Sequence, residues 1–136
     1  MSIEDNKKLA QEFYAALDRG EFDRMDEFCH KDFVFYSQVD TPKPGVSGLI
    51  DSERPSFEAF ESYSFALKQV VAEGDKVAAY LLFEGKNHIR QLGVMAPHNK
   101  DLRMSVFCLL TFKDGKIIEK RAHIDGADAL AQLAAG

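Results

Sequence analysis

Three long segments in the second half of the chain have the period-two residue pattern of β-strands. They span residues 77–88, 102–112 and 117–125, and this period is typical of strands that bury one face. The pair Asp114-Gly115, which favours a tight hairpin turn, joins the last two segments. This half of the chain therefore predicts an antiparallel meander, one face of which needs a cover.

Helices in the first half are expected to provide that cover. The apolar stripe of Leu9, Phe13 and Leu17 predicts a first helix, with Ser2 as its N-cap and Gly20 at its end. The residue pattern further predicts a short helix over 22–29, a strand over 33–36, a loop over 38–55 that forms a pocket lid or a surface excursion, a helix over 56–67, a fourth meander strand over 70–73 and a closing helix over 127–134.

Helices that come first and strands that come later, with little alternation, indicate an α+β fold. The length of 136 residues lies in the usual range of one domain. A short meander must curve strongly to bury a face against the helices. We therefore expect one domain over residues 1–136, in which a cone-shaped, curved mixed sheet packs on three N-terminal helices and encloses a pocket.

Composition argues against several classes of partner. The net charge of -5 disfavours binding to a nucleic-acid backbone, and no apolar run reaches the ~18 residues of a membrane span. The polar N-terminus has no signal segment, so a cytoplasmic location is expected. The four histidines lack metal-ligand spacing, and no glycine-rich phosphate loop is present, so we expect neither metal nor cofactor. Cys29 and Cys108 are expected to be buried, reduced thiols.

The last predicted strand holds the best candidates for chemistry. Alternation places His123 and Asp125 on one face, about 7 Å apart. In an apolar cavity, burial would raise the pKa of a carboxyl toward neutrality and suit it to acid–base catalysis. His88 or His123 could orient that group or donate to a developing oxyanion. The alternative for Asp125 is a helix N-cap or an ion pair with Arg121.

Two segments resemble a known family. The stretch from Phe13 to Asp23 resembles the first helices of the nuclear transport factor 2-like superfamily. Residues 112–119, followed by Asp125 and the closing 130–133 segment, resemble its SnoaL-like polyketide cyclase branch. The resemblance implies a cone-shaped fold with a deep apolar pocket, a homodimer formed through the sheet, and ring closure by aldol condensation without cofactor or metal. It also implies that Asp125 occupies the acid–base position.

Two positions depart from that pattern. Arg121 stands where many members carry tryptophan, and Ser105 stands where a pocket histidine is frequent. Two hypotheses therefore stay open. The first is a cofactor-independent acid–base enzyme of the cyclase, isomerase or lyase type, which acts on a small apolar oxo-compound such as a polyketide-like intermediate. The second is a non-catalytic module of the same fold that binds a small ligand or another protein.

The predicted site divides by role. The catalytic candidates are Asp125, His88 and His123. The substrate-binding candidates are Tyr14, Phe35, Tyr36, Phe60, Tyr80, Ser105, Phe107 and Arg121. The expected partners are a small apolar molecule and a second copy of the chain, because a sheet of this size leaves one apolar face uncovered. Nucleic acid and membrane are not expected as partners.

Overall fold

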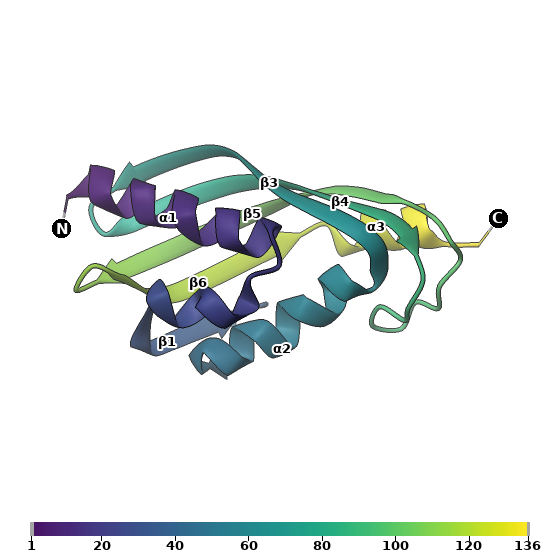
Figure 1. Cartoon of the computed structure of the whole chain (residues 1–136), viewed down its shortest axis with the longest axis horizontal. Helices are drawn as coiled ribbons and strands as arrows, with labels where there is room; N and C mark the ends of the chain where they lie inside the picture. Colours follow the sequence, from purple (N-terminus) through teal and green to yellow (C-terminus); the bar gives the residue numbers. More distant parts are fainter. Residues whose placement is uncertain (1, 136) are drawn as a thin grey trace.

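A curved, six-stranded mixed sheet forms the centre of the protein (Figure 1). The structure is a computed structural model that describes residues 2–135. Its strand order is β2-β1-β6-β5-β4-β3; β1 and β6 pair in parallel, and the other neighbours pair antiparallel. The elements are α1 (Ile3–Asp18), the 3-10 helix η1 (Phe22–Glu27), β1 (Cys29–Tyr36), β2 (Pro42–Pro44), α2 (Gly45–Glu58), β3 (Phe60–Glu73), β4 (Lys76–His88), β5 (Leu102–Lys113), β6 (Lys116–Ile124) and α3 (Gly126–Leu133).

Helix α1 begins and ends where the sequence predicts. The Ser2 hydroxyl accepts from the Asp5 amide at 3.0 Å and the Asp5 carboxylate accepts from the Ser2 amide at 3.3 Å, which together form a capping box. Gly20 has a φ of 71°, a conformation that glycine adopts without strain, and it ends the helix. Phe13 and Leu17 are fully buried against the sheet. The α1 stripe therefore covers one part of the inner sheet face.

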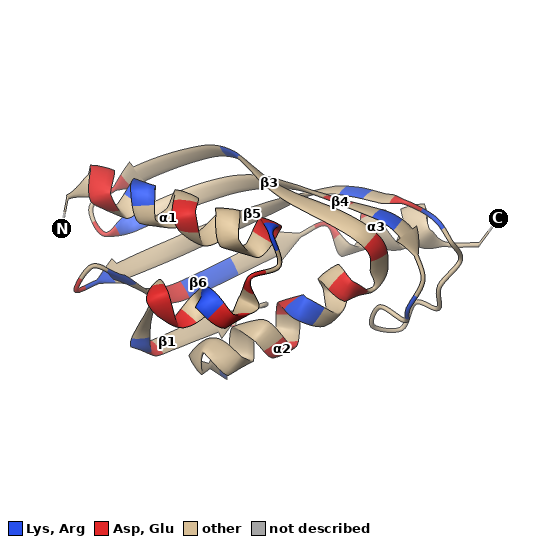
Figure 2. Cartoon of the chain, in the orientation of Figure 1, with Lys and Arg blue, Asp and Glu red and all other residues tan. Residues whose placement is uncertain are grey.

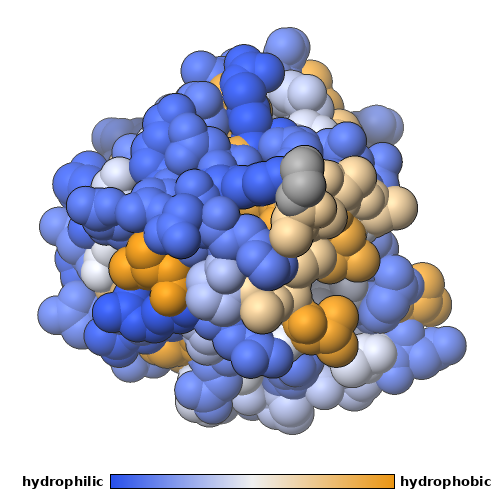
Figure 3. All heavy atoms as spheres, turned by 90° about the vertical axis from the view of Figure 1, so that its right-hand side faces the viewer, coloured by the Kyte–Doolittle hydropathy of each residue, from blue (hydrophilic) through white to orange (hydrophobic). Residues whose placement is uncertain are grey.

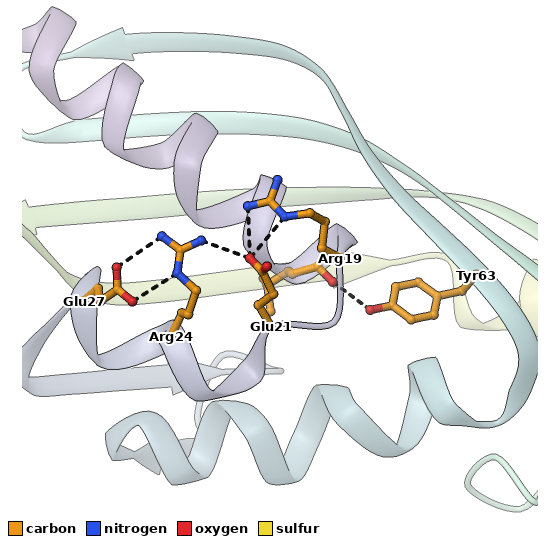
Figure 4. Close-up of polar contacts among 6 residues, drawn as sticks. Arg19, Glu21, Arg24, Glu27 and Tyr63 are labelled. Atoms are coloured by element: carbon orange, nitrogen blue, oxygen red, sulfur yellow. Dashed lines mark hydrogen bonds and ion pairs between the residues drawn. The ribbon is translucent and has the colours of Figure 1, made fainter.

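A tyrosine ties α1 to the edge strand β3 (Figure 4). The Tyr63 hydroxyl donates to the Leu17 carbonyl at 2.7 Å. Burial raises the pKa of Tyr63 to about 12, so the hydroxyl keeps its proton at neutral pH. Nearby, Arg24 bridges Glu21 and Glu27 on the surface (Figure 4). Exposed ion pairs of this kind contribute little, so the half-buried tyrosine hydrogen bond is the stronger contact.

The middle of the chain corrects two predictions. The expected loop over 38–55 contains β2 and most of α2, and the expected helix over 56–67 is instead the end of α2 and the start of β3. The three prolines of this segment favour a loop, yet each fits a regular element. Pro42 lies in the edge strand β2, Pro44 is the N-cap of α2, and Pro55 lies inside α2. The sheet thus has six strands in residues 2–135, because β1 and β2 join the four-stranded meander.

The two faces of the sheet differ in their cover. Helices α1, η1 and α2 lie over the inner face, and α3 closes one end (Figure 1). Most charged residues lie on helices and strand ends, and β6 carries charge in the middle of the sheet (Figure 2). In residues 2–135, no helix combines the length and the hydropathy of a membrane span. The α+β prediction of a curved mixed sheet packed on N-terminal helices is confirmed.

Candidate functional site

A cavity of about 490 Å³ lies between the inner sheet face, α2, α3 and the loop over 89–101. Most of its lining is apolar. At the end of the molecule where α3 lies, apolar side chains also gather on the surface (Figure 3), and Val94, Ile124 and Leu130 are exposed there. The lining residues are Phe35, Ser37, Ser52, Glu53, Ser56, Phe57, Phe60, Phe65, Phe83, Leu92, Gly93, Val94, Met95, Leu102, Met104, Val106, Ala122, Ile124, Gly126, Ala129, Leu130 and Leu133.

The polar groups of the cavity come mainly from α2. Ser52, Glu53 and Ser56 lie within about one helical turn of each other, so they share one side of the helix. Ser37, which follows β1, is the fourth polar residue of the lining. The Ser52 hydroxyl donates to the Gly48 carbonyl at 2.8 Å. Ser37 and Ser56 make no side-chain hydrogen bond within residues 2–135, so their hydroxyls are free to contact a ligand.

Glu53 forms a buried ion pair with Lys120. The Lys120 ammonium donates to Glu53 Oε1. The Lys120 side chain is 0% exposed and the Glu53 side chain 13% exposed. Glu53 Oε2 is also buried, yet it has no hydrogen-bond partner in the described part of the chain. One carboxylate oxygen is therefore held by lysine, while the other is available at the wall of the cavity.

Three aromatic rings, one of them in the cavity wall, surround the Lys120 ammonium. Its Nζ atom lies 5.3 Å from the Phe13 ring centroid, 5.1 Å from that of Tyr14 and 5.7 Å from that of Phe35. Ring faces attract cations, and more strongly where water is excluded. Because Lys120 shares the inner face of β6 with Ala122, which lines the cavity, the cation is fixed just behind the site.

Asp125 lies elsewhere than predicted. Its side chain is exposed and caps α3, where it accepts from the Asp128 amide at 3.0 Å. Its neighbours Ile124 and Gly126 line the cavity, but Asp125 does not. The expected placement of this carboxylate in an apolar cavity is therefore wrong, and the helix-cap alternative describes its position. A helix N-terminus accounts for the carboxylate because free amides there need acceptors.

Several other candidates lie on the outer face of the sheet. His123 is exposed and pairs in register with Phe107. Phe107 in turn pairs with Tyr80, and their rings meet edge to face at 6.3 Å. Ser105 is exposed on the same strand. The predicted role of these four residues as cavity lining is wrong, because alternation places them on the side of the sheet opposite to the cavity.

Arg121 and Tyr36 also lie on the outer face. The Arg121 guanidinium stacks over the Tyr36 ring, 3.9 Å from its centroid, and donates to Glu119. Neither Arg121 nor Tyr36 lines the cavity. Cross-strand pairing of β1 with β6 explains the contact, because Tyr36 and Arg121 are direct register partners. The predicted substrate-binding role of this pair therefore has no counterpart in the cavity.

The remaining candidates lie on the inner side. Phe35 and Phe60, two of the predicted substrate-binding residues, line the cavity. Phe60 can approach β4 because Gly85 has no side chain: a Cβ atom there would lie 2.5 Å from the Phe60 ring. Tyr14 is buried in the core beside Lys120, outside the cavity lining. The aromatic pattern thus identified two walls of the site.

His88 is fully buried, although two residues earlier on the strand Lys86 is exposed. Asn87 has a φ of 57°, which interrupts the alternation and turns the histidine inward. The ring packs on Phe60 at 5.3 Å between centroids. Neither ring nitrogen has a hydrogen-bond partner within residues 2–135. His88 therefore lies behind the wall of the cavity rather than in its lining.

Residues 2–135 contain no cluster of three or more His, Cys, Asp or Glu side chains that could hold a metal ion. Cys29 and Cys108 are buried free thiols. Burial raises the pKa of Cys29 to about 12 and raises that of Cys108 as well. Both thiols are therefore protonated at neutral pH and are poor nucleophiles.

The sequence analysis missed Glu53 and Lys120. Glu53 lies in the 38–55 segment, for which the sequence predicts a loop and the structure has α2. Lys120 did carry a signal, because it shares its strand face with Ala122 and Ile124. A lysine on an apolar face is rarely buried without a partner. That pattern could have prompted a search for a buried carboxylate.

Comparisons with known proteins agree with this architecture. A sequence model of the SnoaL-like polyketide cyclase family matches residues 8–133. A comparison with curated protein sequences gave no match. Among solved structures, a SnoaL-like protein from Jannaschia sp. CCS1 is 19% identical, with a TM-score of 0.88 and coverage of 100% of this chain and 96% of that one. TsrD from Streptomyces laurentii is 20% identical, with a TM-score of 0.86 and coverage of 100% and 99%.

AclR from Streptomyces galilaeus is 23% identical, with a TM-score of 0.84 and coverage of 97% of this chain and 86% of that one. Likeness at this level of identity supports the shared fold. The family match covers most of the chain and confirms the resemblance seen in the sequence. The chain belongs to the SnoaL-like polyketide cyclase family.

Proposed function

We propose that the protein is a cofactor-independent acid–base enzyme that acts on a small apolar oxo-compound, with Glu53 as the group that moves the proton. One observation carries this proposal: within residues 2–135, one carboxylate lies at the wall of a mostly apolar cavity, with Oε1 held by Lys120 and Oε2 without a hydrogen-bond partner. A fixed carboxylate with a free oxygen suits proton abstraction, because a general base must contact the proton that it removes.

The proposed reaction begins at a C–H bond next to a carbonyl group. Glu53 Oε2 accepts the proton, and the electron pair of the C–H bond moves toward the carbonyl oxygen to give an enolate. Ser37 and Ser56, whose hydroxyls have no hydrogen-bond partner within residues 2–135, donate to that oxygen. Lys120 is a positioning residue: it fixes the Glu53 carboxylate from behind and balances its charge. The enolate carbon can then form a bond to the carbon of a second carbonyl, whose oxygen becomes an alkoxide, and Glu53 returns the proton to that alkoxide oxygen.

The family supports this class of chemistry. Its description is that of polyketide cyclases, and aldol ring closure begins with removal of a proton next to a carbonyl. IdmH from Streptomyces antibioticus, 20% identical with a TM-score of 0.79, is described as a candidate polyketide cyclase, and AclR as a candidate hydroxylase. For this chain, the finer assignment rests on the Glu53 site.

Hydrogen–deuterium exchange into a model ketone tests the proposal without a known substrate. The probe is 2-tetralone, a small apolar ketone with an acidic C–H bond, followed in D2O by NMR. Wild-type protein should accelerate exchange above the buffer rate. Glu53→Gln should remove most of that acceleration, because general-base catalysis contributes roughly 10²–10⁴-fold. Asp125→Asn is the matched control, since asparagine keeps the helix cap and Asp125 lies outside the cavity.

Three outcomes would contradict the proposal. Equal exchange by wild type and Glu53→Gln would exclude Glu53 as the base. Loss of exchange in Asp125→Asn alone would return the acid–base role to Asp125. Saturable binding of 2-tetralone with exchange at the buffer rate would favour the non-catalytic binding module of the same fold.

We further propose that a second copy of the chain covers the outer sheet face. Val71, Tyr80, Phe107 and Leu109 expose apolar surface there, and Phe107 at its centre is 52% exposed. Large exposed apolar patches usually mark interaction sites. Light scattering at micromolar concentration should give twice the monomer mass for wild-type protein. The Phe107→Glu variant should give the mass of one monomer. A wild-type monomer at that concentration would refute the dimer.

A further inference from the structure

The charges around the cavity favour one kind of ligand. Within residues 2–135, Glu53 is the one charged residue of the lining, and no lysine, arginine or histidine lines the cavity. Lys120 is close, but it contacts Glu53 Oε1 and is enclosed by aromatic rings. A ligand would therefore meet the carboxylate before the cation.

An anionic ligand fits this arrangement poorly. Its charge would lose water on entering an apolar cavity, a transfer that costs several kcal/mol for an unpaired ion. It would also lie near the negative Glu53 oxygen, and like charges repel strongly where water is excluded. Ser37, Ser52 and Ser56 offer only hydroxyl groups in return. A carboxylate or phosphate group therefore has no site in this cavity.

A hydrogen-bond donor fits well. Glu53 Oε2 is buried and has no hydrogen-bond partner in the part of the chain that the structure describes, and buried polar atoms are nearly always hydrogen-bonded. A hydroxyl group of a ligand would meet this need, and hydrogen bonds to a charged acceptor are the stronger ones. Phe57, Phe60 and Phe83 offer flat apolar surface to the rest of such a ligand.

We propose that the cavity selects neutral, flat ring compounds that carry a phenolic or enolic hydroxyl, and that this hydroxyl donates to Glu53 Oε2. The proposal rests on the site named under the proposed function and identifies the ligand class of that site. This hydroxyl would take the place of the acidic C–H bond in the proposed reaction, so Glu53 Oε2 would contact an acidic hydrogen in both cases.

Three naphthalene probes of similar size separate the contributions of hydrogen bonding and charge. They are 2-naphthol, which is a neutral donor at pH 7, 2-methoxynaphthalene, which lacks the donor, and 2-naphthoate, which is an anion. The chain contains no tryptophan, so naphthalene fluorescence can be titrated without indole emission. Wild-type protein should bind 2-naphthol at least about 10-fold more tightly than 2-methoxynaphthalene, given the usual strength of hydrogen bonds to charged groups. It should bind 2-naphthoate at least about 100-fold more weakly than 2-naphthol, given the cost of burying an unpaired ion.

Variants test whether Glu53 causes the selection. In Glu53→Gln the preference for 2-naphthol over 2-naphthoate should fall at least about 10-fold, since the buried negative charge is gone. Glu58→Gln, an exposed change at the end of the same helix, should keep the wild-type preference. If Glu53→Gln alone fails to fold because Lys120 is left unpaired, the double variant Glu53→Gln/Lys120→Met removes both charges and should show the same loss.

The proposal would be overturned if wild-type protein bound all three probes alike or bound 2-naphthoate most tightly. Equal selection by wild type and Glu53→Gln would also overturn it. These readouts are separate from catalysis. If Glu53→Gln loses ketone exchange but wild-type protein does not discriminate among the probes, Glu53 remains the proposed base and this ligand class is rejected. If wild-type protein discriminates among the probes but does not accelerate ketone exchange, the ligand class is supported and the proposed base is rejected.

Discussion

The two ends of the inner sheet face are built from the same strands and yet have opposite interiors. Under α1, large side chains pack on the sheet, and Phe13, Tyr14 and Leu17 are almost completely buried. The space of about 530 Å³ at this end is an open groove between α1 and β3. Under α2 and α3, the sheet borders a cavity of about 490 Å³. On β5, Leu110 belongs to the filled end and Leu102 to the hollow end, although both are buried. The difference arises from the helices above the sheet.

This comparison teaches where the protein gains stability and where it can hold a ligand. A close-packed interior gains contacts on every side of each residue. A wall of a cavity has neighbours on one side only, so it gives up part of that gain. The Glu53–Lys120 pair lies at the boundary, with the lysine in the filled end and the carboxylate at the hollow end.

Removal of the boundary lysine should have the largest effect on stability. Lys120→Met leaves the Glu53 carboxylate buried without its partner, which typically costs about 3–5 kcal/mol. Urea denaturation should show this loss in the free energy of unfolding. The double variant Lys120→Met/Glu53→Gln should recover most of it, because no unpaired charge remains. A single variant as stable as wild type would show that the boundary pair does not hold the two ends together.

Two leucines on one strand compare the ends directly. Leu110→Ala should cost about 2–5 kcal/mol, because it opens a new cavity in a packed region. Leu102→Ala should cost less, because its side chain already borders empty space. The measurement is again the free energy of unfolding in urea. Equal losses at the two positions would mean that the hollow end is as tightly packed in solution as the filled end.

At the hollow end, Asp125 should contribute to the stability of the protein and not to ligand affinity. Asp125→Ala removes the N-cap of α3 and should cost about 1 kcal/mol. Asp125→Asn should remain close to wild type, because asparagine caps helices well. Thermal denaturation of both variants, together with 2-naphthol titration, checks this. A loss of ligand affinity in the asparagine variant, with unchanged stability, would place Asp125 in the binding site.

His88 provides the smallest expected change. It is buried behind the cavity wall, and neither ring nitrogen has a partner among residues 2–135. His88→Leu should therefore change the free energy of unfolding by less than about 1 kcal/mol, since it removes no protein hydrogen bond. Urea denaturation near neutral pH measures it. A large loss would reveal that the imidazole makes a polar contact that supports the hollow end.

Sequence reasoning recovered the filled end better than the hollow end. The stripe of α1 and the period of β4 to β6 are regular over long stretches, so local pattern and tertiary structure agree there. Helix α2 is different, because it starts after two prolines and contains Pro55. Its formation depends on packing against the sheet more than on local residue pattern. The period of the strands was clear, but the choice of the buried face depended on that helix.

The candidate site was predictable only in part for the same reason. The sequence predicts that Phe35 and Phe60 bind substrate, and both line the cavity. It does not predict Glu53, because this residue lies in the 38–55 segment, for which a loop is expected. His88 is buried because Asn87 adopts a left-handed conformation that residue patterns do not reveal. Asp125 could serve as a cap or as a base on local grounds, and the direction of its side chain decided between them.

Two adjacent cations of strand β6 lie on opposite faces of the sheet, and their contacts favour one register of β6 during folding. Lys120 points inward to Glu53, and Arg121 points outward over Tyr36. A slip of one residue during folding would exchange the two sides. Lys120 would then leave Glu53 and the aromatic rings for the outer face, and Arg121 would leave Tyr36 for the inner face. Because each cation has its own partner, the two contacts together penalise the misaligned sheet and guide β6 into one register.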